Sequence, residues 1–280
     1  MINCKPYTDE AYSFYQSVCT KKQNTALDPN YRTRLELFNN NIRILYDDYD
    51  NLFDANNLEA IVAHGYVDPE KADLLKLYNY NSAALQKLKN IVTTTEHGRK
   101  VKCQNCTIND VNTFDHLVPK DDFAEFAVNP KNLIPCCSQC NSLKSNNWRN
   151  DGIRSSLNLY LDELPRVQYL FVNVEVGNRS IETNFYIDNR NNMDNRLFQL
   201  ISSHYQQLRL FERFSEAADD VITALKNIIE PSRNILNLKD VQSLVGCIIE
   251  KDQIAFGYNY WQSILKLKLM GNNDFMIDYI

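Results

Sequence analysis

The sequence predicts a mainly α-helical protein, α+β overall, in which a small module of short strands is inserted between two helical regions. Three observations support this fold class. Glycine and proline are scarce, with 7 and 8 among 280 residues, which favours helices over a turn-rich β-sandwich. Apolar residues recur at helical spacing up to about residue 90 and again from residue 194. Between these regions, residues 101–150 are loop-like, and five of the eight cysteines fall within residues 103–140.

Residues 1–95 are assigned to an N-terminal helical region. Residues 31–53 predict an amphipathic helix, with an apolar stripe at steps of three and four: Leu35, Phe38, Ile42, Leu45, Tyr49 and Leu52. Residues 68–92 predict a further helix, with Asp68 as its N-cap and Pro69 at its first position. A break at residues 93–100 ends the region. It contains His97, which we interpret as a solvated side chain.

Residues 156–280 are assigned to a C-terminal region, a β-hairpin followed by helices. Residues 167–176 and 181–187 alternate in polarity and are rich in β-branched and aromatic side chains, and a turn sequence joins them. Helical stripes return from residue 194, and His204 lies in one of them, so we interpret it as a packed or hydrogen-bonded histidine.

Composition and charge restrict the class of protein. The longest apolar run is too short to cross a membrane, and the N-terminus lacks the basic and apolar parts of a secretory signal. We therefore expect a soluble cytoplasmic protein whose cysteines do not form a disulfide framework. The net charge of −5 argues weakly against a general nucleic-acid coat protein. Residues 99–154, however, hold eight Lys/Arg against six Asp/Glu, so this part carries +2 and the remainder −7.

The cysteine spacing predicts a structural zinc ion. Cys103 and Cys106 are separated by two residues, as are Cys137 and Cys140, and thirty residues lie between the pairs. A tight turn lets both thiolates of a pair face one ion, and four thiolates suit tetrahedral Zn²⁺. Cys136 does not keep the two-residue gap to Cys140, so we interpret it as a packed or spare thiol. The remaining cysteines are expected to be small buried side chains: Cys4, Cys19 and Cys247.

An aspartate and a histidine stand between the two cysteine pairs. Asp115-His116 ends a short predicted strand, because Pro119 prevents regular continuation. Neighbouring strand residues point to opposite faces, so a shared site for both side chains requires a bulge or a twist.

Polar residues also surround the second cysteine pair. Asn132 precedes it, and a helix is predicted to start near Cys137. If Cys140 opens this helix, then Asn141, Lys144 and Ser145 lie on one side of its first turns: they are spaced i, i+3 and i+4.

The stretches TFDHLVPK and NPKNLIPCCSQCNSLKS resemble the HNH endonuclease family, in its zinc-containing form with two Cys-x-x-Cys pairs. The matching elements are Asp115-His116, Pro119, Asn132-Leu133, the second cysteine pair, Asn141 and Lys144. The resemblance covers roughly residues 100–150. It implies a ββα-metal finger, in which a β-hairpin and a helix grip one divalent ion. We therefore assign residues 96–155 to an HNH nuclease module with a structural zinc.

The resemblance implies a role for each matching residue. His116 matches the general base, whose neutral imidazole would titrate near physiological pH. Asp115 and Asn141 match metal ligands, and oxygen ligands favour Mg²⁺ or Mn²⁺ at this second site. Asn132 matches the residue whose side-chain carbonyl orients the imidazole. Lys144 would neutralise phosphate charge.

The chain departs from some family members at the metal site. Histidine is absent at positions 141 and 145, so a three-histidine metal cage cannot form. Water and substrate phosphate would therefore complete the coordination, as Mg²⁺ commonly allows.

The basic residues of the module predict DNA as the substrate, with RNA as the runner-up. Phosphate contacts are expected from Lys144 and from five further residues: Arg99, Lys100, Lys102, Arg149 and Arg154.

A wider likeness to bacterial HNH proteins implies an effector of phage defence, with an ATPase or other regulatory protein as its partner. The acidic flanks would repel DNA until a partner supplies a basic surface. The alternative is a non-catalytic zinc-finger adaptor that binds nucleic acid or protein.

Overall fold

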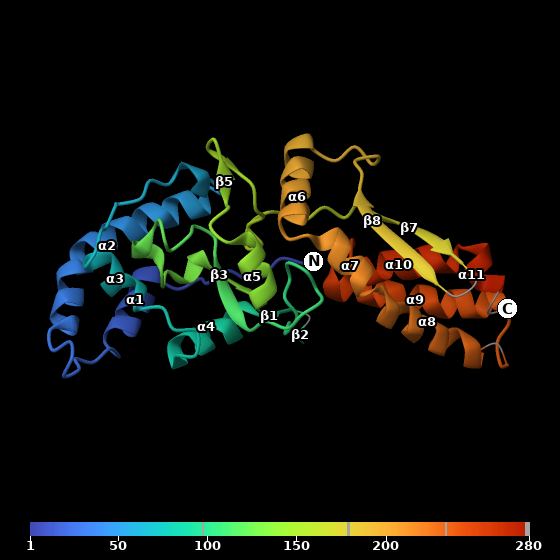
Figure 1. Cartoon of the computed structure of the whole chain (residues 1–280), viewed down its shortest axis with the longest axis horizontal. Helices are drawn as coiled ribbons and strands as arrows, with labels where there is room; N and C mark the ends of the chain where they lie inside the picture. The colour runs from blue at the N-terminus through green and yellow to red at the C-terminus, as the bar shows by residue number, and fades with distance from the viewer. Residues whose placement is uncertain (97, 178–179, 233, 278–280) are drawn as a thin grey trace. The chain divides into compact units, whose positions relative to one another are not determined.

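The computed structural model describes residues 1–96, 98–177, 180–232 and 234–277 (Figure 1). His97 and part of the turn predicted at 177–180 lie outside the described residues. The chain divides into two compact units. One comprises residues 3–104 and 109–163, and the other comprises residues 1–2, 105–108 and 164–280. The three regions delimited from the sequence stay a prediction.

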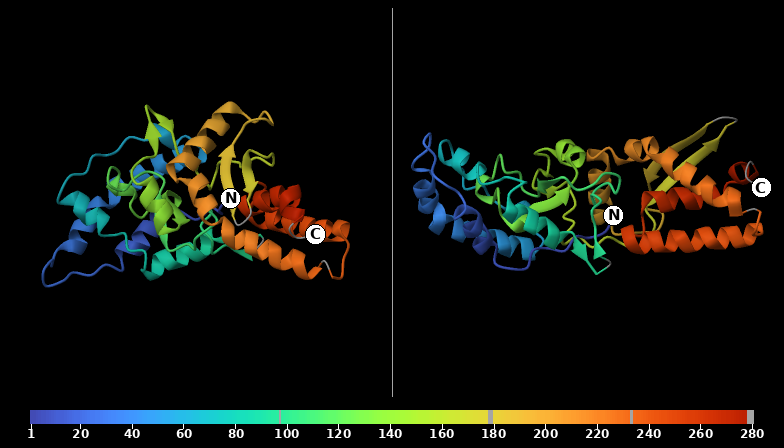
Figure 2. Two further views of the ribbon diagram at one scale, coloured as in Figure 1. Left: turned by 45° about the vertical axis from the view of Figure 1, so that its right-hand side comes forward. Right: turned by 90° about the horizontal axis from the view of Figure 1, so that it is seen from below.

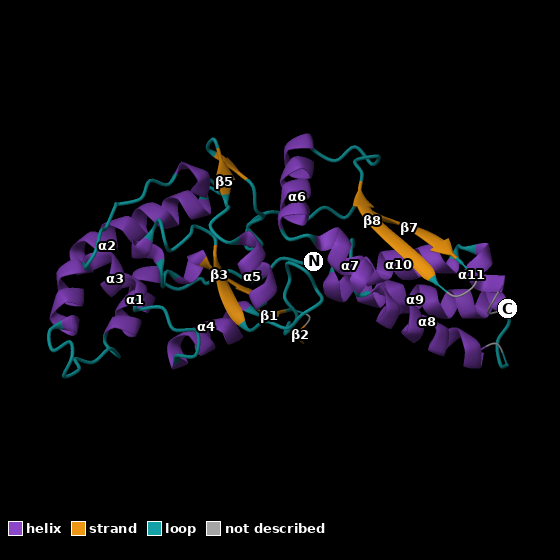
Figure 3. Ribbon diagram, viewed as in Figure 1, coloured by secondary structure: helices purple, strands orange, loops and turns teal. Residues whose placement is uncertain are grey.

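Helices make up about half of the chain, and the named strands pair in two-stranded antiparallel sheets (Figure 3). This composition confirms the predicted fold class, mainly α with a small strand-containing module and α+β overall. Among the described residues, no helix combines the length and the apolar character needed to cross a membrane.

The N-terminal helices bury an aromatic stripe. They are α1 (Ala11–Cys19), α2 (Tyr31–Asp54), the 3₁₀ turn η1 (Leu58–Ala60), α3 (Glu70–Leu75) and α4 (Ala83–Val92). In the second half of α2, Tyr46 and Phe53 are buried, whereas Leu45 and Leu52 of the predicted stripe are half-buried. The reason is the helical period of about 3.6 residues, which brings positions 46 and 53 closer to the centre of the stripe.

A turn interrupts the helix predicted over residues 68–92. α3 begins at Glu70, after Pro69, so Asp68 is not its N-cap. The Asn79 side chain accepts a hydrogen bond from the Asn81 N–H at 3.1 Å, a local turn that competes with helix. α4 then restarts with Ser82 as its N-cap. Two helices therefore replace one, and the residues between them are free to reach other elements.

The module between the cysteine pairs has a ββα order. β3 (Thr113–His116) pairs with β4 (Leu133–Cys136) residue by residue, and α5 (Ser138–Lys144) follows. Two 3₁₀ turns lie in the connection: η2 (Ala124–Phe126) and η3 (Pro130–Asn132). Short strand pairs stand before and after the module: β1 (Thr94–Thr95) with β2 (Gly98–Arg99), and β5 (Arg149–Asn150) with β6 (Ile153–Arg154).

Cys137 caps the start of α5. Its sulfur accepts a hydrogen bond from the Cys140 N–H at 3.4 Å, so the helix begins before Cys140. Ser145 has a φ of 51° and stands just after the end of the helix, whereas the sequence placed it on the helical side shared with Asn141.

The C-terminal unit confirms the predicted hairpin and the helices that follow. β7 (Leu170–Val176) pairs antiparallel with β8 (Ile181–Ile187). The helices are α6 (Asn195–Gln207), α7 (Leu210–Glu216), α8 (Ala218–Ser232), α9 (Leu238–Phe256), α10 (Trp261–Met270) and α11 (Asn273–Ile277). α10 contacts both α8 and α9, and the three run alongside one another (Figure 2).

The core of this unit is aromatic. Trp261 of α10 stacks on Phe214 of α7, with ring centroids 5.2 Å apart, and His204 of α6 is buried as the sequence predicts. Cys247, in contrast, is exposed. The buried face of α9 contains Val241, Val245 and Ile249, and position 247 points away from it because successive helical residues are about 100° apart.

Candidate functional site

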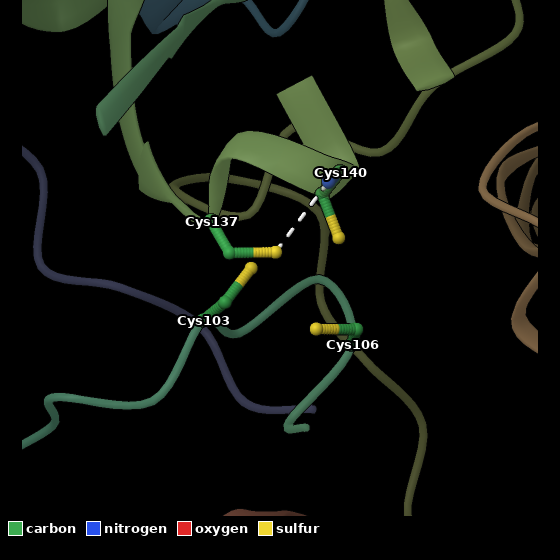
Figure 4. Close-up of side chains that lie close together, drawn as sticks. All are labelled: Cys103, Cys106, Cys137 and Cys140. Carbon is green, nitrogen blue, oxygen red and sulfur yellow. Dashed lines mark hydrogen bonds between the residues drawn. The ribbon is translucent and has the colours of Figure 1, made fainter. Parts of the chain in front are cut away.

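The four cysteines predicted to hold zinc form one cluster (Figure 4). Their sulfur atoms all lie within 4.8 Å of one another, and all four residues are buried: Cys103, Cys106, Cys137 and Cys140. The backbone N–H of Ile108 lies 3.5 Å from the Cys106 sulfur, and the Cys140 N–H lies 3.4 Å from the Cys137 sulfur. Such donors favour the thiolate form. Four converging thiolates fit a tetrahedral Zn²⁺ with Zn–S distances of about 2.3 Å.

Two asparagines join the first cysteine loop to the start of α5. The Asn109 amide donates to the Gln139 side chain at 3.0 Å and lies 3.9 Å from the Cys137 sulfur. The Asn112 carbonyl oxygen accepts a hydrogen bond from the Ser138 N–H at 2.7 Å. The zinc cluster is thus braced by side chains that bind no metal, as is common around structural metal sites.

A pocket of about 290 Å³ lies where β3 ends and α5 ends. It brings together the predicted general base, His116, and the two predicted ligands of the catalytic metal, Asp115 and Asn141. Its full lining is Tyr78, Thr113, Phe114, Asp115, His116, Pro119, Lys120, Asp121, Asn141, Ser142, Ser145 and Asn146. β3 pairs with β4 in continuous register through His116, and both Asp115 and His116 nevertheless line the pocket, so no bulge within the strand is present.

The imidazole of His116 is held by a backbone carbonyl. Its Nε2–H donates to the Ala127 oxygen at 3.0 Å, which leaves Nδ1 as the acceptor nitrogen. The Tyr78 ring packs edge-on against it, with centroids 4.9 Å apart. Burial lowers the pKa of His116 to about 4. The ring is therefore neutral at physiological pH and does not titrate there, in contrast to the expectation from the sequence.

Asn132 does not hydrogen bond to the imidazole of His116, contrary to the expectation from the resemblance. Its side-chain oxygen accepts from the Val118 N–H at 2.7 Å, and its amide donates to the carbonyls of Val118 and Phe126 at 3.0 and 3.1 Å. These bonds join the two ends of the segment between Val118 and Phe126. The Ala127 carbonyl, next to that segment, takes the place expected for Asn132 beside His116.

Lys144 is buried and pairs with Asp115. Its ammonium lies 3.1 Å from Oδ1 of Asp115 and donates to the His116 carbonyl at 2.7 Å. Burial raises the pKa of Asp115, and the positive charge of Lys144 opposes that rise. The side chain of Lys144 is only 4% exposed, so it does not make the predicted phosphate contact from this position.

Asp115 and Asn141, the two metal ligands that the resemblance implies, are chemically suited to a divalent metal ion. Both line the pocket, and their carboxylate and amide oxygens are ligands that Mg²⁺ and Mn²⁺ accept. Cys136, next to the zinc ligands, is buried in β4 and is not part of the sulfur cluster.

Two arginines predicted to bind nucleic acid instead form hydrogen bonds and an ion pair within the protein. Arg149 donates to the backbone carbonyls of Glu59 and Ile61. Arg154 forms a two-point ion pair with Asp162, with both distances 2.8 Å. A partly buried guanidinium is stable only when its donors are paired, so these contacts replace the predicted phosphate contacts.

The other three predicted contacts lie near β2, outside the lining of the pocket. Arg99 is exposed and Lys100 is half-buried. Lys102 pairs with Asp110 at 3.0 Å, in a surface position. Any of the three that binds DNA would therefore do so away from the pocket itself.

Sequence reasoning missed two residues that line the pocket, Tyr78 and Lys120, and the Ala127 carbonyl that holds His116. Lys120 directly follows the matched Pro119, so its position in the motif could have revealed it. Tyr78 comes from the turn between α3 and α4, and no sequence signal links it to β3.

Most residues of the site lie in a segment that is similar to a known protein family. Residues 103–147 match the HNH endonuclease family model, a range that includes β3, β4, α5 and all four clustered cysteines. The chain is also similar to Protein ea31 of Escherichia phage lambda, at 25% identity over 187 residues. This match covers 62% of the present chain and 63% of the length of that relative. No solved structure matches the chain.

Proposed function

We propose that this chain, whose residues 103–147 match the HNH endonuclease family model, is a metal-dependent endonuclease that hydrolyses phosphodiester bonds in DNA. One observation carries the proposal. A neutral histidine of fixed tautomer, His116, shares a pocket with two oxygen donors, Asp115 and Asn141. A general base beside a site for a divalent ion is the arrangement that metal-assisted hydrolysis requires.

His116 acts as the general base. Because Nε2–H is engaged by the Ala127 carbonyl, Nδ1 carries the lone pair that accepts a proton from the attacking water. The water oxygen bonds to phosphorus as the P–O3′ bond breaks. The Ala127 carbonyl keeps its hydrogen bond to the protonated ring and so stabilises the imidazolium.

Asp115 and Asn141 would hold Mg²⁺ or Mn²⁺, which when bound polarises the scissile phosphate and stabilises the leaving 3′ oxygen. Lys144 positions this carboxylate, since its ammonium joins Asp115 to the backbone of His116. Asn132 positions the base through the segment that leads to Ala127. Neither residue lines the pocket, so both act through their neighbours.

The test is a nicking assay on supercoiled plasmid with Mg²⁺ or Mn²⁺. Wild type is expected to nick, and His116→Ala is expected to abolish nicking while zinc content stays the same. His64→Ala, which changes an exposed histidine outside the pocket, is the matched control. Equal cutting by wild type and His116→Ala would identify a contaminating nuclease and refute the proposal.

A non-catalytic zinc-finger adaptor is the second candidate. The buried Lys144–Asp115 pair favours it, because the ammonium already neutralises the carboxylate that a metal would use. An adaptor binds its partner equally well as wild type and as His116→Ala, and neither form nicks DNA in any metal. RNA added to the same assay tests the alternative substrate. The role in phage defence and the ATPase partner stay predictions from the resemblance.

A further inference from the structure

We infer that Lys120 is the phosphate-contacting cation of the pocket, and that Asp121 holds its ammonium when no substrate is bound. The inference rests on the proposed nuclease function and names a substrate contact within that site. Lys120 thereby takes the role expected of Lys144, because the ammonium of Lys144 is already bonded to Asp115 and to the His116 carbonyl.

The position of Lys120 supports this role. Among the described residues that line the pocket, Lys120 is the one lysine or arginine, and it shares that lining with Asp115, His116 and Asn141. A phosphodiester bound beside His116 therefore meets the ammonium of Lys120 within the same pocket. Its side chain is 35% exposed, against 4% for Lys144, so solvent and substrate reach it.

The partner of Lys120 is a carboxylate that resembles a phosphate in charge and geometry. The ammonium lies 3.0 Å from Oδ1 of Asp121, whose side chain is 52% exposed. Exposed ion pairs are weak, so a phosphate oxygen can take the place of this carboxylate oxygen. The Asn146 amide contacts the other oxygen of Asp121 at 3.4 Å, which keeps the carboxylate at the pocket.

Two substitutions are therefore expected to act in opposite directions. Lys120→Met removes a phosphate contact and weakens binding. Asp121→Asn frees the ammonium and removes a negative charge that repels the substrate, so it strengthens binding. The matched controls are Lys87→Met on α4 and Asp122→Asn, which change exposed residues outside the pocket lining.

The experiment measures binding of a short fluorescent duplex DNA over a salt series, with each substitution made in the non-cleaving His116→Ala protein. Lys120→Met is expected to weaken binding about tenfold, as expected for one charge-assisted hydrogen bond. It should also flatten the slope of log affinity against log salt by about 0.9, the value for one phosphate. Asp121→Asn is expected to tighten binding severalfold, and both controls to stay near the parent.

Plasmid nicking by the same variants with His116 intact, and zinc content as a check of folding, complete the test. If wild type nicks DNA, and Lys120→Met binds and nicks DNA as well as Lys87→Met does, then the inference is wrong but the proposed nuclease function is retained. If Asp121→Asn loses nicking with zinc retained, Asp121 takes part in the reaction and the holding role is refuted. If wild type neither binds nor nicks DNA, the proposed function and this inference fail together.

Discussion

At the end of β3, the imidazole of His116 is fixed from two directions. The Ala127 carbonyl accepts its Nε2–H, and the Tyr78 ring packs edge-on against it, with ring centroids 4.9 Å apart. Tyr78 is itself fixed, because its hydroxyl donates to the Phe114 carbonyl and accepts from the Phe114 N–H, both at 3.3 Å. The orientation of the proposed base therefore depends on a residue from the turn between α3 and α4.

Substitution of Tyr78 tests this dependence. Tyr78→Ala is expected to lower kcat at least tenfold with little change in KM, because a ring that is free to rotate loses its reactive orientation. Tyr78→Phe keeps the ring and should retain most of kcat. Steady-state nicking kinetics of the two variants test whether Tyr78 orients the imidazole. A Tyr78→Ala protein with unchanged kcat would contradict this role.

The residue scale also shows where the sequence stops being informative. The motif identifies Asp115, His116, Asn132 and Asn141 as polar positions, and three of them share the pocket. It cannot state which carbonyl meets the imidazole, because that depends on how the chain folds around Asn132. The sequence also cannot tell which basic residues are available to bind phosphate. Arg154 pairs with the carboxylate of Asp162, and that contact depends on tertiary packing.

At the scale of elements, the zinc loops are the part that local sequence specifies most strongly. A two-residue gap between cysteines sets the turn, and Cys137 both caps α5 and belongs to the sulfur cluster. The helix over residues 68–92 was a wrong prediction, because apolar periodicity continues through a polar turn that the side chain of Asn79 stabilises. Periodicity therefore locates buried faces better than it locates breaks.

Replacement of two neighbouring cysteines, one at a time, distinguishes a zinc ligand from a thiol that only packs in the core. Cys137→Ala is expected to lose zinc and much of the order of the module, because structural zinc contributes directly to folding. Cys136→Ala, which removes an adjacent buried thiol outside the cluster, should keep zinc and cost only about 1–2 kcal/mol of packing. Metal analysis and circular dichroism distinguish the two, and equal zinc loss would contradict the assignment of the ligands.

The contact between α2 and α3 is expected to make stability depend on pH. Arg34 of α2 donates to Asp73 of α3, with one N–O distance of 3.0 Å, and this hydrogen bonding lowers the pKa of Asp73 below its usual 3.8. A lowered pKa adds stability above the usual value, and this stability is lost as pH falls through the folded pKa.

Asp73→Asn should therefore destabilise the protein at neutral pH and have progressively less effect below about pH 4. Urea unfolding of wild type and variant across this range measures the difference. A destabilisation that is independent of pH would mean that shape and hydrogen bonding, not charge, connect the two helices.

At the scale of the whole molecule, each compact unit has an aromatic core of its own. Tyr46 and Tyr49 lie within the first, and Phe214 and Trp261 lie within the second. Units with separate cores commonly unfold as separate cooperative transitions. The helical content of both was predictable from periodicity, because apolar stripes at helical spacing occur in each.

Calorimetry is expected to resolve two unfolding transitions. A zinc chelator should lower the midpoint of the transition that contains α5, because the metal-dependent ββα segment unfolds in that transition. Heating scans with and without chelator provide the measurement. A single transition that moves as a whole on chelation would show that the two units unfold together.

The side-chain hydrogen bonds of Asn132 affect the entropy cost of the proposed substrate binding. By closing the segment from Val118 to Phe126 on itself, it fixes the carbonyl that holds the imidazole before any nucleic acid arrives. The conformational entropy of that segment is therefore lost during folding and not during association. In the proposed reaction, such a preorganised segment would let binding energy from distant phosphates act on the reacting bond, since none of it would be consumed in ordering the proposed base.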